Sequence, residues 1–240
     1  MKKTLGTLIF LSAICLNAFG TWSIIVVDPK TKEIGIAGAS CTSNCFGIGS
    51  IIPGRGAIIV QAMSNANARD MGRRAIIAGH PIEGILEALR QARFDPEHQQ
   101  YALVTLDQLY PVTYTGDSTI FYKGSLTAKG ISVQGNILSS DKVLKAVFEA
   151  AIQAQKESLS VQEILMKALE AGEDAGGDKR CGEQRAQSAF MQVARPGDNP
   201  ENPYLSLVIK DQPKGEREEK AVVLLRRAYE KWSKEHAAEK

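Results

Sequence analysis

Thr21 is the residue of this sequence that points most directly to chemistry. It follows an apolar leader that ends at Gly20, and it begins a strand-like run, TWSIIVVDP. If the leader is removed, the α-amine of Thr21 becomes free, and a pKa of about 7.7–8.0 leaves part of it neutral near pH 7. A neutral amine can take the proton of its own hydroxyl, directly or through one water, and so make that oxygen a nucleophile. In the precursor the same nitrogen is an amide, so cleavage would also be activation. Because hydroxyl residues are common after signal peptides, Thr21 alone is weak support.

Residues 1–20 have the parts of a secretory signal peptide. Two lysines lead into an apolar stretch, and Ala18 and Gly20 place small side chains before the cleavage point. The apolar stretch is shorter than the roughly 20 residues that a membrane-spanning helix needs. We therefore expect residues 1–20 to be removed and residues 21–240 to form one secreted or periplasmic domain with a C-terminal helix and no membrane span. An uncleaved anchor is the alternative.

Charge and motif content argue against several classes of protein. Without the leader, 27 Lys and Arg residues balance 27 Asp and Glu residues. A nucleic-acid-binding protein would be expected to carry excess positive charge. The sequence has no phosphate-binding loop, dinucleotide fingerprint or metal-ligand spacing, so we expect no cofactor and no metal.

Three cysteines remain after the leader, and export implies an oxidising compartment where thiols pair. Cys41 and Cys45 are closest in sequence, and we predict a bridge between them, with modest stabilisation because the loop is short. Cys181 could replace either partner.

Blocks of strands alternate with blocks of helices along the chain. Runs rich in β-branched or aromatic residues predict strands at 21–29, 33–40, 56–65, 99–107, 109–117, 130–138, 186–195 and 203–211. Apolar periodicity predicts helices at 66–80, 81–93, 139–155 and 160–172, and in the tail 217–236. Ser160 and Glu163 form a possible capping box, and Gly172 a possible helix stop. Such blocks favour an α+β fold with largely antiparallel sheet.

Four segments together closely resemble the domain of unknown function 1028 family. They are the runs that begin at Thr21, Gly56, Gly130 and Glu170, which include the specific sequences SVQGN and AGGDKR. The resemblance covers about residues 21–230 and implies the N-terminal-nucleophile (Ntn) hydrolase-like fold, a four-layer α-β-β-α sandwich. In the family's cytoplasmic members a threonine follows the initiator methionine, and the leader boundary puts Thr21 at the matching place. The family's activity is not established, so no reaction follows from it.

Two of these segments suggest partners for Thr21. Asn136 ends the SVQGN strand and could donate a hydrogen bond to an oxyanion, although Gly-Asn is also ordinary turn chemistry. Lys179, after the glycine pair, could lower the pKa of the Thr21 amine or hydroxyl, and Asp178 could orient that cation. A solvated loop is the alternative. The family sequence usually continues at once into the next strand, but here CGEQR intervenes.

Polar residues after the third expected strand could contact a substrate. Gln61, Ser64 and Asn65 are the candidates, and they could equally cap the helix that follows. The second expected strand carries no lysine of the kind that proteasome-like hydrolases place there, and Lys32 falls in a turn. That absence argues against proteasome-like peptidase activity.

The sequence therefore suggests an exported amidohydrolase that acts through Thr21 on a small amide or peptide-like substrate. A non-catalytic binding protein and an envelope structural protein are the alternatives. Trapping of Thr21 by an electrophile would separate the first hypothesis from the other two.

Overall fold

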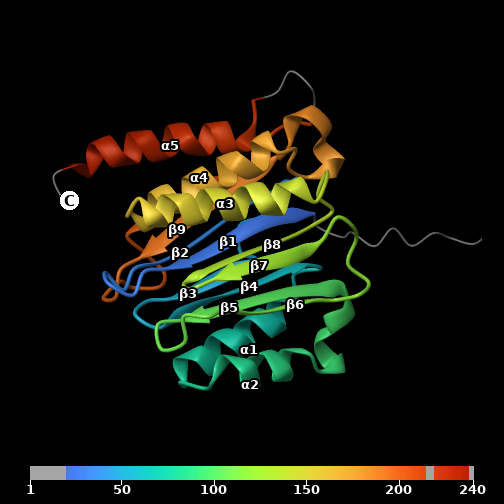
Figure 1. The fold of residues 1–240 in the computed structure, drawn as a ribbon, viewed down its shortest axis with the longest axis vertical. Coiled ribbons are helices and arrows are strands. Elements are labelled where there is room, and N and C mark those ends of the chain that lie inside the picture. Colours follow the sequence, from blue (N-terminus) through green and yellow to red (C-terminus); the bar gives the residue numbers. More distant parts are fainter. Residues whose placement is uncertain (1–19, 215–218, 238–240) are drawn as a thin grey trace, which may run out of the picture.

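The structure is a computed structural model that describes residues 20–214 and 219–237. Two antiparallel sheets lie face to face, with one group of helices outside each (Figure 1). This arrangement confirms the expected mixed α+β class. The expected signal segment lies outside the described residues except for Gly20.

The six-stranded sheet contains the first and last strands of the chain, and β1, which begins at Thr21, is one of its two central strands. Its strands run in the order β10-β9-β2-β1-β8-β7, and neighbours are antiparallel. The strands are β1 (Thr21–Val27), β2 (Ile34–Ser40), β7 (Gly124–Ala128), β8 (Ile131–Asn136), β9 (Ser188–Ala194) and β10 (Leu205–Ile209).

The four-stranded sheet lies against the inner face of the first. Its order is β3-β4-β5-β6, again antiparallel throughout. The strands are β3 (Gly49–Ile52), β4 (Gly56–Ala62), β5 (Gln99–Thr105) and β6 (Val112–Thr115). The sequence did not predict β3 or β7, because both are short and less buried than their neighbours.

Helices cover the outer face of each sheet. In Figure 1, α3, α4 and α5 lie over the six-stranded sheet and α1 and α2 lie under the four-stranded one. The α-helices are α1 (Ala66–Ile77), α2 (Ile82–Leu89), α3 (Lys142–Lys156), α4 (Val161–Asp174) and α5 (Ala221–Glu235). Three short 3-10 helices span Ala92–Phe94, Pro96–His98 and Lys179–Gln184. Val222, Leu225 and Tyr229 of α5 pack into the core.

The predicted glycine stop of the 160–172 helix is wrong. Helix α4 continues through Gly172 to Asp174, and the Ser160 side chain makes no capping hydrogen bond. A Cβ atom on Gly172 would lie 2.5 Å from Nε1 of Trp22, so the glycine allows the helix to pack closely against β1. Its role is therefore close packing rather than termination.

Apolar side chains form three layers of core. One lies between the six-stranded sheet and its helices, the second between the two sheets, and the third between the four-stranded sheet and α1 and α2. Within the residues described, no helix is long and apolar enough to cross a membrane.

Candidate active site

Thr21 is the first residue of β1, and its side chain lies on the face that meets the second sheet. Side chains alternate between the faces of a strand. Trp22 donates a hydrogen bond to the Leu169 carbonyl of α4 (3.3 Å), so it faces the helices. Ser23 donates to Oε1 of Gln61 in β4 (2.6 Å), so it faces the other sheet. Thr21 shares the face of Ser23.

Two polar residues flank Thr21 on that face. The register places Ser40 of β2 and Asn136 of β8 directly opposite Thr21, one on each side. Side chains directly opposite in antiparallel strands have Cβ atoms roughly 4.5–5.5 Å apart. The end of β1 that carries Thr21 therefore has a polar residue on each side. Strand β2 contains no lysine.

Thr21 also lines a pocket of about 270 Å³. Most of the loop that follows β2 forms one wall, and Ser64 and Arg69, before and within α1, contribute the other. A residue that begins a strand and borders a pocket can present a hydroxyl to a small ligand. The pocket therefore marks the candidate active site.

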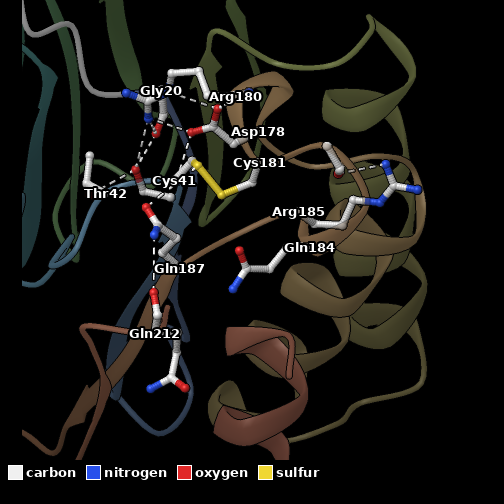
Figure 2. The surroundings of a disulfide bond; sticks show 12 residues. Gly20, Cys41, Thr42, Asp178, Arg180, Cys181, Gln184, Arg185, Gln187 and Gln212 are labelled. Atoms are coloured by element: carbon white, nitrogen blue, oxygen red, sulfur yellow. Dashed lines mark hydrogen bonds and ion pairs between the residues drawn. A yellow bond between two sulfur atoms is a disulfide. The ribbon is translucent and has the colours of Figure 1, made fainter. Parts of the chain in front are cut away.

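The peptide carbonyl that precedes Thr21 is held by two donors. Ser40 Oγ donates a hydrogen bond to the Gly20 oxygen, and Nη2 of Arg180 donates to the same oxygen at 2.9 Å. Figure 2 shows the Arg180 side chain beside Gly20. A Cβ on Gly20 would lie 2.7 Å from Oδ2 of Asp178, so only glycine fits there without a shift.

Asp178, which precedes the 3-10 helix Lys179–Gln184, holds Arg180 in place beside Gly20. Its buried carboxylate forms an ion pair with Nη2 of Arg180 (2.6 Å) and accepts from the Cys41 backbone N–H (2.9 Å). It also accepts from the Arg180 backbone N–H (3.0 Å), as the N-cap of the 3-10 helix that follows. A buried charge of this kind requires such partners, because unpaired it would be costly.

The cation in this cluster is Arg180, not the predicted Lys179. Lys179 is the first residue of the 3-10 helix, and it is exposed. Capping by Asp178 instead turns Arg180 inward. Asp178 therefore pairs with Arg180 and not with Lys179, and its predicted role beside Thr21 stays a prediction.

The predicted Cys41–Cys45 disulfide is wrong, because Cys41 is bonded to Cys181. Cys41 lies beside the Asp178 segment, which brings Cys181 within bonding distance (Figure 2). Cys45 instead turns into the core between the sheets, where its Sγ lies 3.6 Å from the Gly38 carbonyl oxygen. The bridge therefore ties the end of β2 to the segment that carries Arg180.

The free thiol of Cys45 borders the same pocket as Thr21 but is poorly suited to act as a nucleophile. Burial raises the pKa of this thiol to about 12, against the lowering effect of its hydrogen bond with Ser188. The thiolate is the reactive form of cysteine. Near neutral pH the Cys45 thiol therefore stays protonated, so Cys45 is a weak candidate nucleophile.

A buried network of amide side chains lies between the two sheets, on the face of β1 that carries Thr21. Gln100 of β5 accepts at Oε1 from Nε2 of Gln61 and from Nδ2 of Asn136, both at 2.9 Å. Gln134 of β8 donates to Ser23 (2.7 Å). The Oδ1 atom of Asn136 has no hydrogen-bond partner among the residues described.

The three predicted substrate contacts have different positions. Gln61 is fully buried within the amide network, and only Ser64 lines the pocket. Asn65 is the N-cap of α1: its side chain accepts from the Ala68 N–H (3.1 Å) and donates to the Phe94 carbonyl (3.1 Å). The capping alternative thus describes Asn65, and the sequence missed Arg69.

No group of three or more His, Cys, Asp or Glu side chains that could hold a metal ion occurs in the described parts of the chain.

Comparison with protein families matches residues 21–218 to the family of unknown function DUF1028. The chain belongs to this family. A solved structure of similar fold is that of protein SPO2555 from Silicibacter pomeroyi, described as a DUF1028 protein. It is 25% identical, with a TM-score of 0.73 over 89% of this chain and 86% of that one. Among the curated proteins, none matches.

The DUF1028 match begins at the residue that the sequence singled out. Thr21 is the first residue of both the matched region and β1. The match ends before α5, which packs on β9 and β10.

Proposed function

We propose that this DUF1028 protein, after removal of residues 1–20, is an exported amidohydrolase of the N-terminal-nucleophile type with Thr21 as its nucleophile. The observation that carries the proposal is the position of Thr21, which both follows the leader and lines a pocket. The layering of two sheets between helices is compatible with the α-β-β-α sandwich of such hydrolases.

In the proposed reaction, Thr21 Oγ forms a bond to the carbonyl carbon of an amide while its proton passes to the α-amine. The amine of the substrate then leaves with that proton as the C–N bond breaks, and an ester of Thr21 remains. Water hydrolyses the ester and restores the hydroxyl. No cofactor takes part in these steps.

Asn136 suits two tasks in this mechanism. Its Oδ1 is buried and without a hydrogen-bond partner among the described residues, and it lies opposite Thr21 in the register. A buried acceptor without a partner costs about 1–3 kcal/mol. The freed α-amine could donate to Oδ1, and the Nδ2 hydrogen not used by Gln100 could serve an oxyanion.

Ser40 and Arg180 lose a partner when Gly20 departs. Both donate to the Gly20 carbonyl in the uncleaved chain. After cleavage these donors, with Asp178 behind them, would surround the new α-amine. We propose that the Ser40 hydroxyl accepts a hydrogen bond from this amine, that the positive charge of Arg180 favours its neutral form, and that Asp178 balances the charge of Arg180.

The test combines processing with turnover. N-terminal analysis of the exported protein should find Thr21 first, and a panel of acyl-amide and short-peptide probes should include one that is hydrolysed. Thr21→Ala should fold and lose turnover, whereas Thr21→Ser should keep some because its hydroxyl and amine remain. Equal hydrolysis by wild type and Thr21→Ala would show that Thr21 is not the nucleophile. A mature N-terminus beyond Thr21 would show the same.

A non-catalytic binding protein and an envelope structural protein remain the alternatives. If no probe reacts and no electrophile labels Thr21, the binding-protein function becomes the better explanation of the pocket.

A further inference from the structure

Arg69 is the one charged residue among those that line the Thr21 pocket. The rest of the lining consists of neutral polar, thiol and apolar residues, including the hydroxyls of Thr42 and Ser64 and the side chains of Phe46 and Ile48. Because arginine stays protonated in proteins, the pocket wall carries a fixed positive charge. No carboxylate of the lining offsets it.

The Arg69 guanidinium has no hydrogen bond or ion pair with any other described residue. The nearest carboxylate in sequence, Asp70, is already paired with Arg73 (3.0 Å) and Arg74 (2.6 Å). Burial lowers the pKa of Arg69, and the charge of Asp70 opposes this only in part. A half-buried cation without a partner is left with unused capacity for an anion.

We propose that Arg69 binds a carboxylate of the substrate, so that the pocket takes a small amide that carries a negative charge, such as an N-acyl amino acid. An arginine fork binds a carboxylate through two parallel hydrogen bonds, which fixes orientation as well as charge. The lining offers a single charged side chain, which matches a singly charged carboxylate better than a doubly charged phosphate.

The size of the pocket limits the ligand further. A volume of about 270 Å³ corresponds to roughly nine water molecules at about 30 Å³ each. N-acetyl-L-alanine, with a similar number of heavy atoms, is of this size, whereas a long peptide could enter only by one end.

This inference deepens the proposed function, and it is tested by binding in a protein that cannot turn over. Thr21→Ala, expressed with its leader and isolated after processing, is titrated with N-acetyl-L-alanine and with its neutral match, N-acetyl-L-alaninamide. We expect the carboxylate to bind and the neutral amide to bind roughly 10- to 100-fold more weakly, as expected for hydrogen bonds to a charged group.

Variants on α1 identify the residue responsible. Adding Arg69→Met should weaken binding of N-acetyl-L-alanine by a similar factor, and Arg69→Lys should restore part of it. Arg74→Met is the matched control, because Arg74 lies on the same helix and is exposed, outside this pocket. Its binding should be unchanged.

Three results would overturn the assignment. They are equal binding by the Arg69→Met and Arg74→Met proteins, absence of carboxylate binding in the parent protein, and tighter binding of inorganic phosphate or phosphate esters than of carboxylates. The nucleophile is tested separately, because a small neutral electrophile needs no anion site. Labelling of Thr21 without Arg69-dependent binding defeats only this inference, and Arg69-dependent binding without labelling defeats only the proposed hydrolase.

Discussion

The layer between the two sheets has two ends of opposite character, and β1 runs through both. At one end, Ile25 and Val27 join a cluster of buried aliphatic and aromatic side chains from both sheets. At the other end, Thr21 and Ser23 meet Gln61, Gln100, Gln134 and Asn136, which are all buried and linked mainly by side-chain hydrogen bonds.

The two ends differ in what they contribute: one mainly stabilises the fold, and the other mainly orients polar groups. Burial of an aliphatic side chain stabilises a fold by roughly 1.5–3 kcal/mol, whereas a buried hydrogen bond contributes a net of only about 0.5–1.5 kcal/mol. An amide network fixes donors and acceptors in defined directions, which aliphatic packing does not. The apolar end therefore holds the sheets together, and the polar end orients the surroundings of Thr21.

The largest loss of stability is expected at the apolar end. Ile25→Ala removes a fully buried side chain and should lower the free energy of unfolding by about 2–5 kcal/mol. Urea unfolding measures this loss, with Ile25→Val as the smaller control. Electrophile labelling of Thr21 in the folded fraction should stay close to wild type, and a large drop would mean that the two ends are not separate.

The Cys41–Cys181 bridge should contribute about 2–4 kcal/mol, because it closes a separation of 140 residues in the unfolded chain. The double variant Cys41→Ala/Cys181→Ala should show this loss in urea unfolding. Unlike Ile25→Ala, it should also slow labelling of Thr21, since the bridge holds the segment of Arg180. Wild-type labelling in the folded double variant would show that the bridge only stabilises.

Gln100→Ala should cost less stability, about 1–3 kcal/mol, because it leaves the donors of Gln61 and Asn136 without their acceptor. Its effect on Thr21 labelling should exceed that of Ile25→Ala despite the smaller change in stability. The reverse order of the two labelling rates would contradict the division into a stabilising end and an orienting end.

The smallest change concerns Cys45, which belongs to the apolar cluster between the sheets and also lines the pocket. Its raised pKa of about 12 keeps the thiol protonated, so iodoacetamide should not alkylate it in the folded protein at pH 9. An ordinary thiol, with a pKa near 8.5, is largely thiolate at that pH. Mass analysis after alkylation checks this, with urea-unfolded protein as the positive control. Rapid alkylation of the folded protein would return Cys45 to consideration as a nucleophile.

Most strands and helices could be predicted from the sequence, because a buried strand or helix face requires an apolar run or stripe in the local sequence. The continuous apolar run of β1 and the Val222, Leu225 and Tyr229 stripe of α5 are examples. The short strands β3 and β7 lack such runs, because each is only partly buried and pairs through a short turn with the strand that follows it. Gly172 shows a different limit, since its role depends on Trp22, which is distant in sequence, rather than on its own helix.

The candidate site was only partly predictable. Thr21 has local signals, the leader boundary and the family resemblance, whereas Arg69 resembles any charged residue on a helix. The pairing of Cys181 follows from docking of the Asp178 segment, which sequence distance does not reveal. Choosing Arg180 over Lys179 likewise required the turn that Asp178 caps.

Covalent trapping of Thr21 tests the central claim most directly. Processed protein is treated with a small neutral electrophile such as a β-lactone, and the modified residue is located by peptide mass analysis. We predict a single acyl group on Thr21 Oγ, absent from Thr21→Ala and from protein whose N-terminus retains Gly20, because an amide nitrogen cannot accept the proton. Equal labelling of Thr21 with and without a free α-amine, or none in a processed and folded protein, would contradict the account.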